Sequence, residues 1–558
     1  MTQDAPEDRS QQVLDGAFGC GYLVLGGDRI TAPDLVAGWP VHRLGSLRYH
    51  LHPRARLHTA IRDGGPGRIV ILGDPADVDT GTVDGTVICR TALDVWASGG
   101  LSATVRYLAY LGGRWTAVLE AAPHDGPGDH AAGGPRDGSA EITVVPDCQA
   151  TQAVFYSTRG GGLAMGSQPA LAAAAVGAGP DAAAEQMMTD LRAARAKGVV
   201  FLPGTMTTHE DVLPLVPNHL LRIGLTDHAA QVAHERFWPF QDRVEIDDTD
   251  RIVTEFIDYF REHTKLLCGI GRPIVSLTGG KDSRTTLAAA LPNLHRDSFT
   301  FTYYNPRDGL VGEGAPLDVF TANALANAVG VPHRVLRWRQ PAKGSVFAEI
   351  YDRTYPVRRG STGAAHAMWA DLPHDVIHLQ SIGAELGTTF YASRPGVPIT
   401  PERLLEIVTG RGDLPEQMAR DAFGDYLDYA QFRQSAIGGY DYHDVFYWEQ
   451  RMGKWGYQKY QDGDFSHRML MPFNARGLIE IMQSLPYRQR ADKVLLTAML
   501  ATVPMLADSR LPAHLRTGPA APEAEPIGWR DLVHARPHVR PRIRSALDRV
   551  AARRGGMP

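Results

Sequence analysis

A strand, a glycine loop and a helix follow one another between Pro273 and Leu291, which reads PIVSLTGGKDSRTTLAAAL. The β-branched run up to Leu277 predicts a buried strand, and the alanine-rich run that begins near Asp282 predicts a helix. At such a junction the backbone N–H groups of the loop and the positive end of the helix dipole point to the same place. The stretch therefore predicts a cradle for pyrophosphate.

The side chains of this loop also suit phosphate and a divalent cation. The loop consists of Thr278, Gly279, Gly280, Lys281, Asp282 and Ser283. The two glycines lack a Cβ and let the backbone approach a ligand, while the threonine and serine supply hydroxyl donors. The lysine adds a positive charge, and the aspartate offers the hard oxygen ligands that Mg²⁺ prefers. An ordinary Gly-Gly turn between a strand and a helix is the alternative interpretation.

The spacing excludes a Walker-type loop, which has four residues between its first glycine and Gly-Lys-Ser/Thr. The segment Thr278–Ser283 resembles the SGGxDS loop of the ATP pyrophosphatases, with threonine in the first position. The resemblance implies that ATP is cleaved between its α and β phosphates, that AMP is transferred to an acceptor, and that the loop holds the departing pyrophosphate.

Strands and helices alternate after the loop. Strands are predicted at 298–303, 333–336 and 376–379, with a helix at 316–329 between the first two. This alternation is typical of a parallel, doubly wound sheet, which binds ligands at the carboxyl ends of its strands. Asp318 and His333 either contact the nucleotide or have a capping and filling role.

Short strands separated by turns dominate the N-terminal part, from Phe18 to about Ala175, and predict a layered, mostly β domain with few helices. Between them, residues 122–140 predict a surface loop. A helix at 181–197 and strands at 199–202 and 220–223 follow. We therefore expect a disordered segment at 1–17, domains at 18–245 and 246–510, and a basic, flexible tail at 511–558.

The order of four segments in this first domain resembles the glutaminase domain of asparagine synthetases. They are Leu111–Leu119, Val145–Cys148, Ala153–Tyr156 and Gly166–Leu171. The resemblance implies an N-terminal-nucleophile (Ntn-type) fold, in which a cysteine with a free α-amine is the nucleophile. Here Cys20 has its nitrogen in a peptide bond unless nineteen residues are removed. We predict a degenerate domain without glutaminase activity, in which Cys20 is a buried strand residue.

The synthetase half carries the same resemblance beyond the loop. Gln380–Gly387 matches a family segment whose aspartate joins the loop aspartate on Mg²⁺, and by register that residue is Glu385. An exposed turn glutamate is the alternative. Ile382 stands where asparagine synthetases have an acidic residue and β-lactam synthetases a catalytic tyrosine. Isoleucine cannot transfer a proton, so the base for the amine is expected elsewhere, with Tyr391 and Glu449 as candidates.

Residues 446–506 resemble the C-terminal pattern of the family: a helix with an acidic residue, a Pro-Phe turn and a lysine that opens a final helix. In β-lactam synthetases that lysine contacts pyrophosphate, which implies this role for Lys493. Stabilisation of negative charge on oxygen in a water-poor site is the physical reason. The alternative is an exposed lysine at the start of a helix.

Composition excludes other classes. The 558 residues have a formal charge of −5 and a pI near 6.5, which gives no general case for nucleic acid. The four cysteines form no CxxC pair, which argues against a zinc ribbon or a redox pair. We find neither a signal sequence nor a run of membrane-spanning length, so the expected compartment is the cytoplasm.

Together these features predict a ligase that uses ATP and Mg²⁺ to join a carboxylate substrate to an amine substrate through an acyl-adenylate. Cyclisation and intermolecular amidation remain open, as does a homodimer, and the composition fits natural-product biosynthesis. The alternatives are a catalytically inactive nucleotide-binding scaffold, an ammonia-dependent asparagine synthetase, and an ATP pyrophosphatase that modifies tRNA. Paired cysteines or an RNA-binding surface, which the last would want, are not visible apart from the tail.

Overall fold

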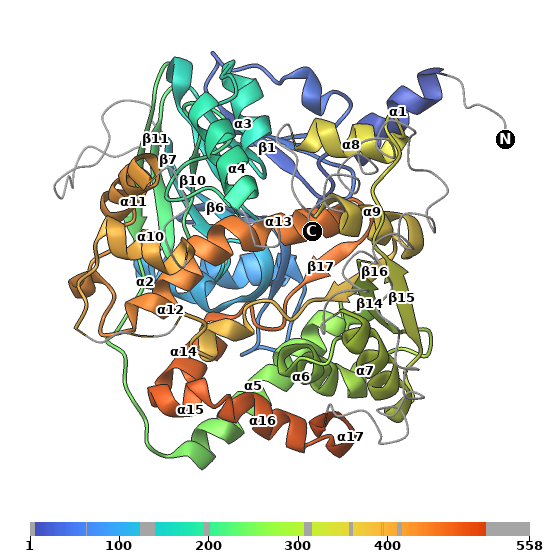
Figure 1. Ribbon diagram of the computed structural model, residues 1–558. Helices are drawn as coiled ribbons and strands as arrows, with labels where there is room; N and C mark the ends of the chain where they lie inside the picture. Colours follow the sequence, from blue (N-terminus) through green and yellow to red (C-terminus); the bar gives the residue numbers. More distant parts are fainter. Residues whose placement is uncertain are drawn as a thin grey trace, which may run out of the picture. The chain divides into compact units, whose positions relative to one another are not determined.

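The computed structural model describes residues 6–62, 64–122, 140–194, 201–305, 315–355, 361–391, 393, 396–409 and 416–508. Two antiparallel sheets and one parallel sheet form its framework (Figure 1). The first sheet contains, in spatial order, β10 (Leu213–Pro214), β8 (Phe155–Ser157), β9 (Leu163–Gly166), β1 (Tyr22–Gly26), β3 (Leu47–Leu51) and β2 (Val41–Leu44). The second contains β12 (Ala230–Arg236), β11 (His219–Leu225), β7 (Ala140–Pro146), β6 (Gly112–Ala121), β5 (Gly67–Ala76) and β4 (Leu57–Ile61).

The two antiparallel sheets share a core because successive side chains of a strand point to opposite faces. Tyr22 and Val24 on β1 pack in one cluster with residues of the second sheet, such as Val70 and Leu72 on β5. The intervening Leu23 and Leu25 pack with helix α3 (Pro169–Val176), and Ile69 and Ile71 pack with helix α2 (Gly85–Tyr110). The layers are therefore helix, sheet, sheet and helix, as expected for a layered β-rich region.

Helix α2, with 26 residues, departs from the prediction of few helices in this region. Asp84 caps it by accepting hydrogen bonds from the N–H groups of Thr86 and Val87. Gly100, at φ 75° and ψ −178°, interrupts the helical backbone near its middle. Glycine adopts a positive φ more readily than other residues. In a sequence, a Gly-Gly pair predicts a loop, so this helix is hard to predict from the sequence alone.

The parallel sheet has the order β15 (His333–Arg337), β14 (Thr300–Tyr304), β13 (Arg272–Ser276), β16 (Val376–Leu379) and β17 (Arg468–Leu470). Val275 packs in one cluster with helices α5 (Thr249–Cys268) and α6 (Lys281–Ala290), whereas Ile274 packs with α9 (Thr362–Asp371) on the other face. The chain leaves β13 towards β14 and later returns on its other side with β16. Such a reversal of direction creates a crevice at the carboxyl ends of the two strands. The predicted parallel sheet is confirmed.

The remaining helices are α1 (Pro6–Gly16), α4 (Ala182–Ala194), α7 (Ala315–Ala328), α8 (Val346–Thr354), α10 (Pro401–Thr409), α11 (Glu416–Tyr429), α12 (Tyr442–Phe446), the π-helix η6 (Tyr447–Gly456), α13 (Tyr457–Asp464), α14 (Arg476–Ser484), α15 (Tyr487–Ala491), α16 (Val494–Ala501) and α17 (Pro504–Ala507). None of the described helices is both long and apolar enough to cross a membrane.

Two expectations about local structure are wrong. The segment 1–17 is not disordered throughout, because residues 6–16 form α1, which packs on α8 and places Arg9 2.6 Å from Glu349. The strand expected to end at Leu202 is absent from Phe201 and Leu202, while 199–200 lie outside the described residues. The expected loop at 122–140, apart from its first and last residues, and the basic tail also lie outside them.

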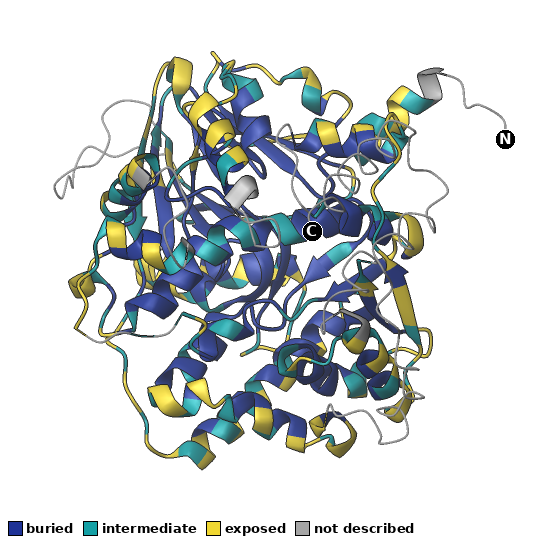
Figure 2. Cartoon of the chain, in the orientation of Figure 1, coloured by how far each residue is buried: buried dark blue, intermediate teal, exposed yellow. Residues whose placement is uncertain are grey.

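The predicted boundary near residue 245 does not separate two compact bodies, since residues 1–509 form one unit. Buried charged pairs cross this boundary: Arg114 on β6 pairs with Asp464 on α13 at 2.6 Å, and Arg236 on β12 pairs with Glu449 at 2.6 Å. The dark interior in Figure 2 likewise runs through both antiparallel and parallel sheets. The two halves therefore share buried contacts rather than a thin linker.

We expect Asp464→Asn to lower the free energy of unfolding by about 3–5 kcal/mol, because Arg114 would then be a buried charge without its partner. Glu235→Gln, which breaks the exposed Arg222–Glu235 pair, is the matched control and should cost less than about 1 kcal/mol. Urea denaturation of both variants measures the difference. Equal, small losses would show that the Arg114–Asp464 pair does not hold the halves together.

Candidate functional site

The predicted cradle lies at the carboxyl end of β13, where the chain turns into α6. Three backbone N–H groups of the turn point at oxygen atoms: that of Gly279 donates to Asp318 Oδ1 at 3.1 Å, that of Gly280 to Thr278 Oγ1 at 3.2 Å, and that of Thr278 to Ser283 Oγ at 3.1 Å. A carboxylate oxygen thus already accepts a hydrogen bond from the loop. This is the interaction that a phosphate oxygen makes at a strand-to-helix turn.

Position 279 leaves little room for a side chain. A Cβ there would lie 3.2 Å from Asp318 Oδ1 and 3.2 Å from Thr321 Cγ2 on α7. Asp318, in the first turn of α7, therefore holds the loop, while its predicted contact with a nucleotide stays a prediction. His333 contacts Thr300 Oγ1 at 2.8 Å on the neighbouring strand, in keeping with the filling role.

Two lysines link the loop to the region of helix α16: Lys281 within the loop and Lys493 immediately before the helix. Lys493 Nζ lies 3.8 Å from Asp282 Oδ1, and Lys281 Nζ donates to Thr497 Oγ1 at 2.9 Å. Lys493 precedes α16 with a φ of 58°, in the left-handed region that residues other than glycine seldom adopt. The structure thus brings together Asp282 and Lys493, which are more than two hundred residues apart in the chain.

Glu385 lies at the end of the adjacent strand β16, in the short 3₁₀ turn η4 (Ala384–Gly387). The Gly383 N–H donates to Glu385 Oε2 at 3.1 Å. Burial, and next the negative charge of Asp282, raise the pKa of Glu385, while a hydrogen bond with Tyr447 lowers it. Two carboxylates from neighbouring strand ends are therefore close enough to repel each other, and a cation between them would remove that repulsion.

The carboxylates of Asp282 and Glu385 have the chemistry of magnesium ligands. Asp282 Oδ1 is buried and accepts no hydrogen bond from the described residues, and both side chains offer hard oxygen ligands. Within the described ranges no group of three or more histidine, cysteine, aspartate or glutamate side chains converges. The protein alone would thus supply two carboxylates, as is usual for Mg²⁺ that is also held by phosphates and water.

Tyr391 packs against Tyr447, an aromatic neighbour of Glu385. Its ring centroid is 5.6 Å from that of Tyr447 and 5.2 Å from that of Phe390. Tyr447 in turn hydrogen-bonds Glu385, and burial raises the pKa of Tyr447 well above its ordinary value. The sequence analysis missed Tyr447, although it precedes Glu449 by two residues in the same helical segment. It stays a neutral hydrogen-bonding partner of Glu385 at ordinary pH.

The carboxylate oxygens of Glu449, one of the two predicted bases, already accept four hydrogen bonds. Arg236 donates to both oxygens at 2.6 and 2.8 Å, and Asn218 Nδ2 and the Tyr426 hydroxyl donate at 3.1 Å each. The residue is 1% exposed. Glu449 joins the two halves of the chain.

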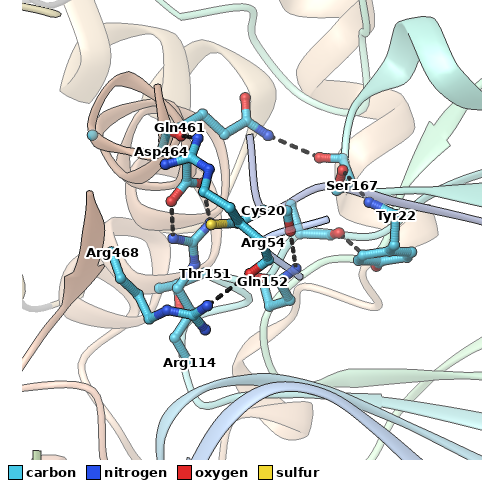
Figure 3. A network of polar contacts seen from close by, with 12 residues as sticks. Cys20, Tyr22, Arg54, Arg114, Thr151, Gln152, Ser167, Gln461, Asp464 and Arg468 are labelled. Carbon is cyan, nitrogen blue, oxygen red and sulfur yellow. Dashed lines mark hydrogen bonds and ion pairs between the residues drawn. The ribbon is translucent and has the colours of Figure 1, made fainter. Parts of the chain in front are cut away.

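Cys20 lies in a polar network between the two halves (Figure 3). Arg54 donates to Ser466 O at 3.0 Å, the Arg114–Asp464 pair lies beside it, and Gln152 Nε2 approaches Cys20 O at 3.5 Å. Burial and then the charge of Asp464 raise the pKa of the Cys20 thiol, which disfavours the nucleophilic thiolate. Cys20 is buried, as expected, but it does not lie in a strand: it is in the turn before β1, with a φ of 55°.

No family model matches the chain, and no curated protein matches it. Among solved structures, glutamine phosphoribosylpyrophosphate amidotransferase from B. subtilis, complexed with ADP and GMP, is 11% identical with a TM-score of 0.21, over 74% of this chain and 75% of its own. An allosteric regulatory enzyme of purine biosynthesis is 11% identical with a TM-score of 0.22, over 74% of each chain. Glutamine-dependent NAD+ synthetase from Acinetobacter baumannii, in complex with ADP, is 13% identical with a TM-score of 0.16, over 34% and 38%. TM-scores this low support no inference about this chain.

The raised pKa of Glu385 predicts a pH-dependent stability. The folded chain holds this proton more tightly than the unfolded chain, so the contribution of Glu385 falls as pH rises through and above its ordinary value of 4.5. Between pH 4 and 7, the parent protein should lose stability relative to Glu385→Gln. Denaturation midpoints of both proteins across this range test the sign. A constant difference would show that folding does not raise the pKa of Glu385.

Proposed function

We propose that the chain is an ATP-dependent ligase that joins a carboxylate to an amine and releases AMP and pyrophosphate. The observation that carries this proposal is the convergence of three separate chain segments at the crevice between β13 and β16. Lys493 Nζ lies 3.8 Å from Asp282 of the loop 278–283, and the charge of Asp282 raises the pKa of Glu385, which supports the site that the resemblance to asparagine synthetases and β-lactam synthetases implies. A structural turn alone would not require a carboxylate pair and a strained lysine.

The proposed first step is attack of a substrate carboxylate oxygen on the α-phosphorus of ATP. The bond from the α-phosphorus to the bridging oxygen breaks, and pyrophosphate leaves with its electron pair. The N–H groups of the loop and the ammonium groups of Lys281 and Lys493 would stabilise this negative charge electrostatically. Bound Mg²⁺, held by Asp282 and Glu385, would neutralise charge on the phosphates.

The proposed second step is attack of the amine on the acyl carbon, with loss of AMP and of one amine proton. Glu449 is engaged elsewhere, and Ile382 is buried in the core with no titratable group. Tyr391 therefore remains the predicted residue for this proton. Asparagine formation from ammonia is less well supported because position 382 lacks the family's acidic side chain.

An amine, rather than glutamine, is the proposed nitrogen source. The Cys20 nitrogen is part of a peptide bond, its thiol is buried, and its surroundings are filled by arginine side chains and their partners. Both groups of an Ntn-type nucleophile are thereby engaged. A role in natural-product biosynthesis, by ring closure or by joining two molecules, extends the same proposal.

We expect the protein to form AMP and pyrophosphate from ATP with Mg²⁺ when the matching carboxylate is present, and to catalyse exchange of labelled pyrophosphate into ATP. Asp282→Asn should lower this exchange by at least about 100-fold, since it weakens the cation site and its charge balance. Asp258→Asn, which changes an exposed aspartate on α5, is the matched control and should leave the rate unchanged. Pools of carboxylates and amines serve as candidate substrates, and chromatography separates the nucleotide products.

Other products would count against the proposal. ADP and phosphate would indicate a phosphorylated intermediate instead of an adenylate. Tight ATP binding without cleavage, for every pool of carboxylates, would favour the nucleotide-binding scaffold.

Lys493→Gly is expected to separate stability from activity. Relief of the left-handed backbone, worth about 1–2 kcal/mol, offsets the extra entropy of glycine in the unfolded chain, so the free energy of unfolding should change by less than about 1 kcal/mol. Pyrophosphate exchange should nevertheless fall by at least about 100-fold, because the ammonium group is lost. Lys493→Val should lose the same activity and be less stable than Lys493→Gly. Full activity of the glycine variant would exclude Lys493 from the site.

A further inference from the structure

A cavity of about 40 Å³ lies away from the loop 278–283, in contact with both halves of the chain. Its wall is formed by α3, the segment 202–208, the end of α8 and the helices η6 and α13. The lining residues are Phe155, Gln168, Pro169, Ala170, Met188, Leu202, Met206, Thr207, Thr208, Thr354, Tyr355, Lys454, Tyr457 and Gln458. None of them, all within the described part of the chain, carries a carboxylate.

The charge in this wall is Lys454, which is 5% exposed. Within the described residues its ammonium donates one hydrogen bond, to Met206 O at 2.6 Å. Burial lowers the pKa of Lys454 to about 7, and no charged side chain opposes that effect. A buried cation without a counter-charge is costly, so an anion beside it would be bound favourably.

A second polar group of the same wall, the Gln168 side-chain amide, has an acceptor atom without a hydrogen-bond donor among the described residues. Gln168, before the first turn of α3, is 3% exposed, and its Oε1 accepts no hydrogen bond from the described residues. A buried acceptor of this kind is stabilised by a ligand that carries an N–H or O–H donor. The remaining wall, with Phe155, Met188 and Leu202, suits a short apolar group.

The space accommodates a small ligand and is partly open to solvent. Each water in a cavity needs roughly 10–15 Å³ of a volume measured in this way. The cavity therefore has room for roughly three waters. That corresponds to an acid with about three carbons.

We propose that this cavity is a binding site for a small carboxylate with a neighbouring hydrogen-bond donor, namely a 2-hydroxy acid or an amino acid. Its carboxylate would pair with Lys454 and its hydroxyl or ammonium group with Gln168 Oε1. The proposal is independent of the adenylation proposed above, because the residues involved are not those of the loop.

The test is titration of the full-length protein with L-lactate, L-alanine and propionate. Calorimetry or ligand-observed NMR measures the binding. At pH 6 we expect L-lactate or L-alanine to bind at least about 5-fold more tightly than propionate, which lacks the donor. Lactate and alanine distinguish a hydroxyl donor from an ammonium donor. Failure of all three acids to bind at millimolar concentration would overturn the proposal.

Two substitutions assign the binding to this cavity. Lys454→Met keeps the length of the side chain and removes its charge, so it should weaken binding at least about 10-fold. Gln168→Leu should abolish the preference over propionate. Lys265→Met, which changes an exposed lysine on α5, is the matched control and should bind as the parent does. Unchanged binding by folded Lys454→Met would also overturn the proposal.

The pH dependence of the parent protein gives a test that needs no variant. Only protonated Lys454 pairs with the carboxylate, so with a pKa of about 7 the affinity should fall roughly 10-fold between pH 6 and pH 8. Tyr355 and Tyr457 are the other titratable groups in the wall, and Tyr457→Phe should retain this profile. An affinity that is constant over this range would contradict pairing with Lys454.

Discussion

The need to pair buried charges fixes how the two halves of this chain meet. Arg114, Arg236 and Arg468 each place a guanidinium group in the interior or near it, opposite Asp464, Glu449 and Asp74 respectively. A lone charge in such a place would cost several kcal/mol, so Arg114 and Arg236 require their partners from the other half, whereas Asp74 also pairs with Arg56 of its own half. The antiparallel sheets and the parallel sheet therefore form one unit, although the sequence has the pattern of two domains.

The helical segment 442–464 is the element that this pairing orients most directly. In its π-helical part, Tyr447 hydrogen-bonds Glu385 at the crevice, Glu449 contacts Arg236 of the antiparallel sheet, and Lys454 faces the cavity. π-Helical turns are rare and concentrate at functional sites, where they redirect side chains. Because Glu449 is held by the N-terminal half, that half also sets the position of Tyr447. The antiparallel sheets thereby influence the candidate site at the crevice.

The sequence was sufficient for the features that depend on local order. The strand, glycine loop and helix at 273–291, and the parallel sheet around them, follow from hydrophobic runs and turn residues. Helix α2 could not be recognised in the same way, because its apolar side chains are spread around the helix and Gly99–Gly100 interrupts it. The role of Glu449 was also hidden. Its partners Arg236, Asn218 and Tyr426 are distant in the chain, and only folding brings their donors to one carboxylate.

Local strain and local charge in the candidate site support each other. Lys493 keeps a backbone conformation that glycine would adopt at less cost, and its ammonium lies beside the carboxylate of Asp282, whose Oδ1 accepts no hydrogen bond in the described structure. Stability alone gives no reason for a lysine rather than a glycine at this position, and it would favour a better-satisfied carboxylate at the other. The combination is understandable if both groups are held ready for a ligand that carries negative oxygens and a cation. MgATP is such a ligand, and the Gly279 N–H, already bonded to a carboxylate oxygen, faces the same kind of partner.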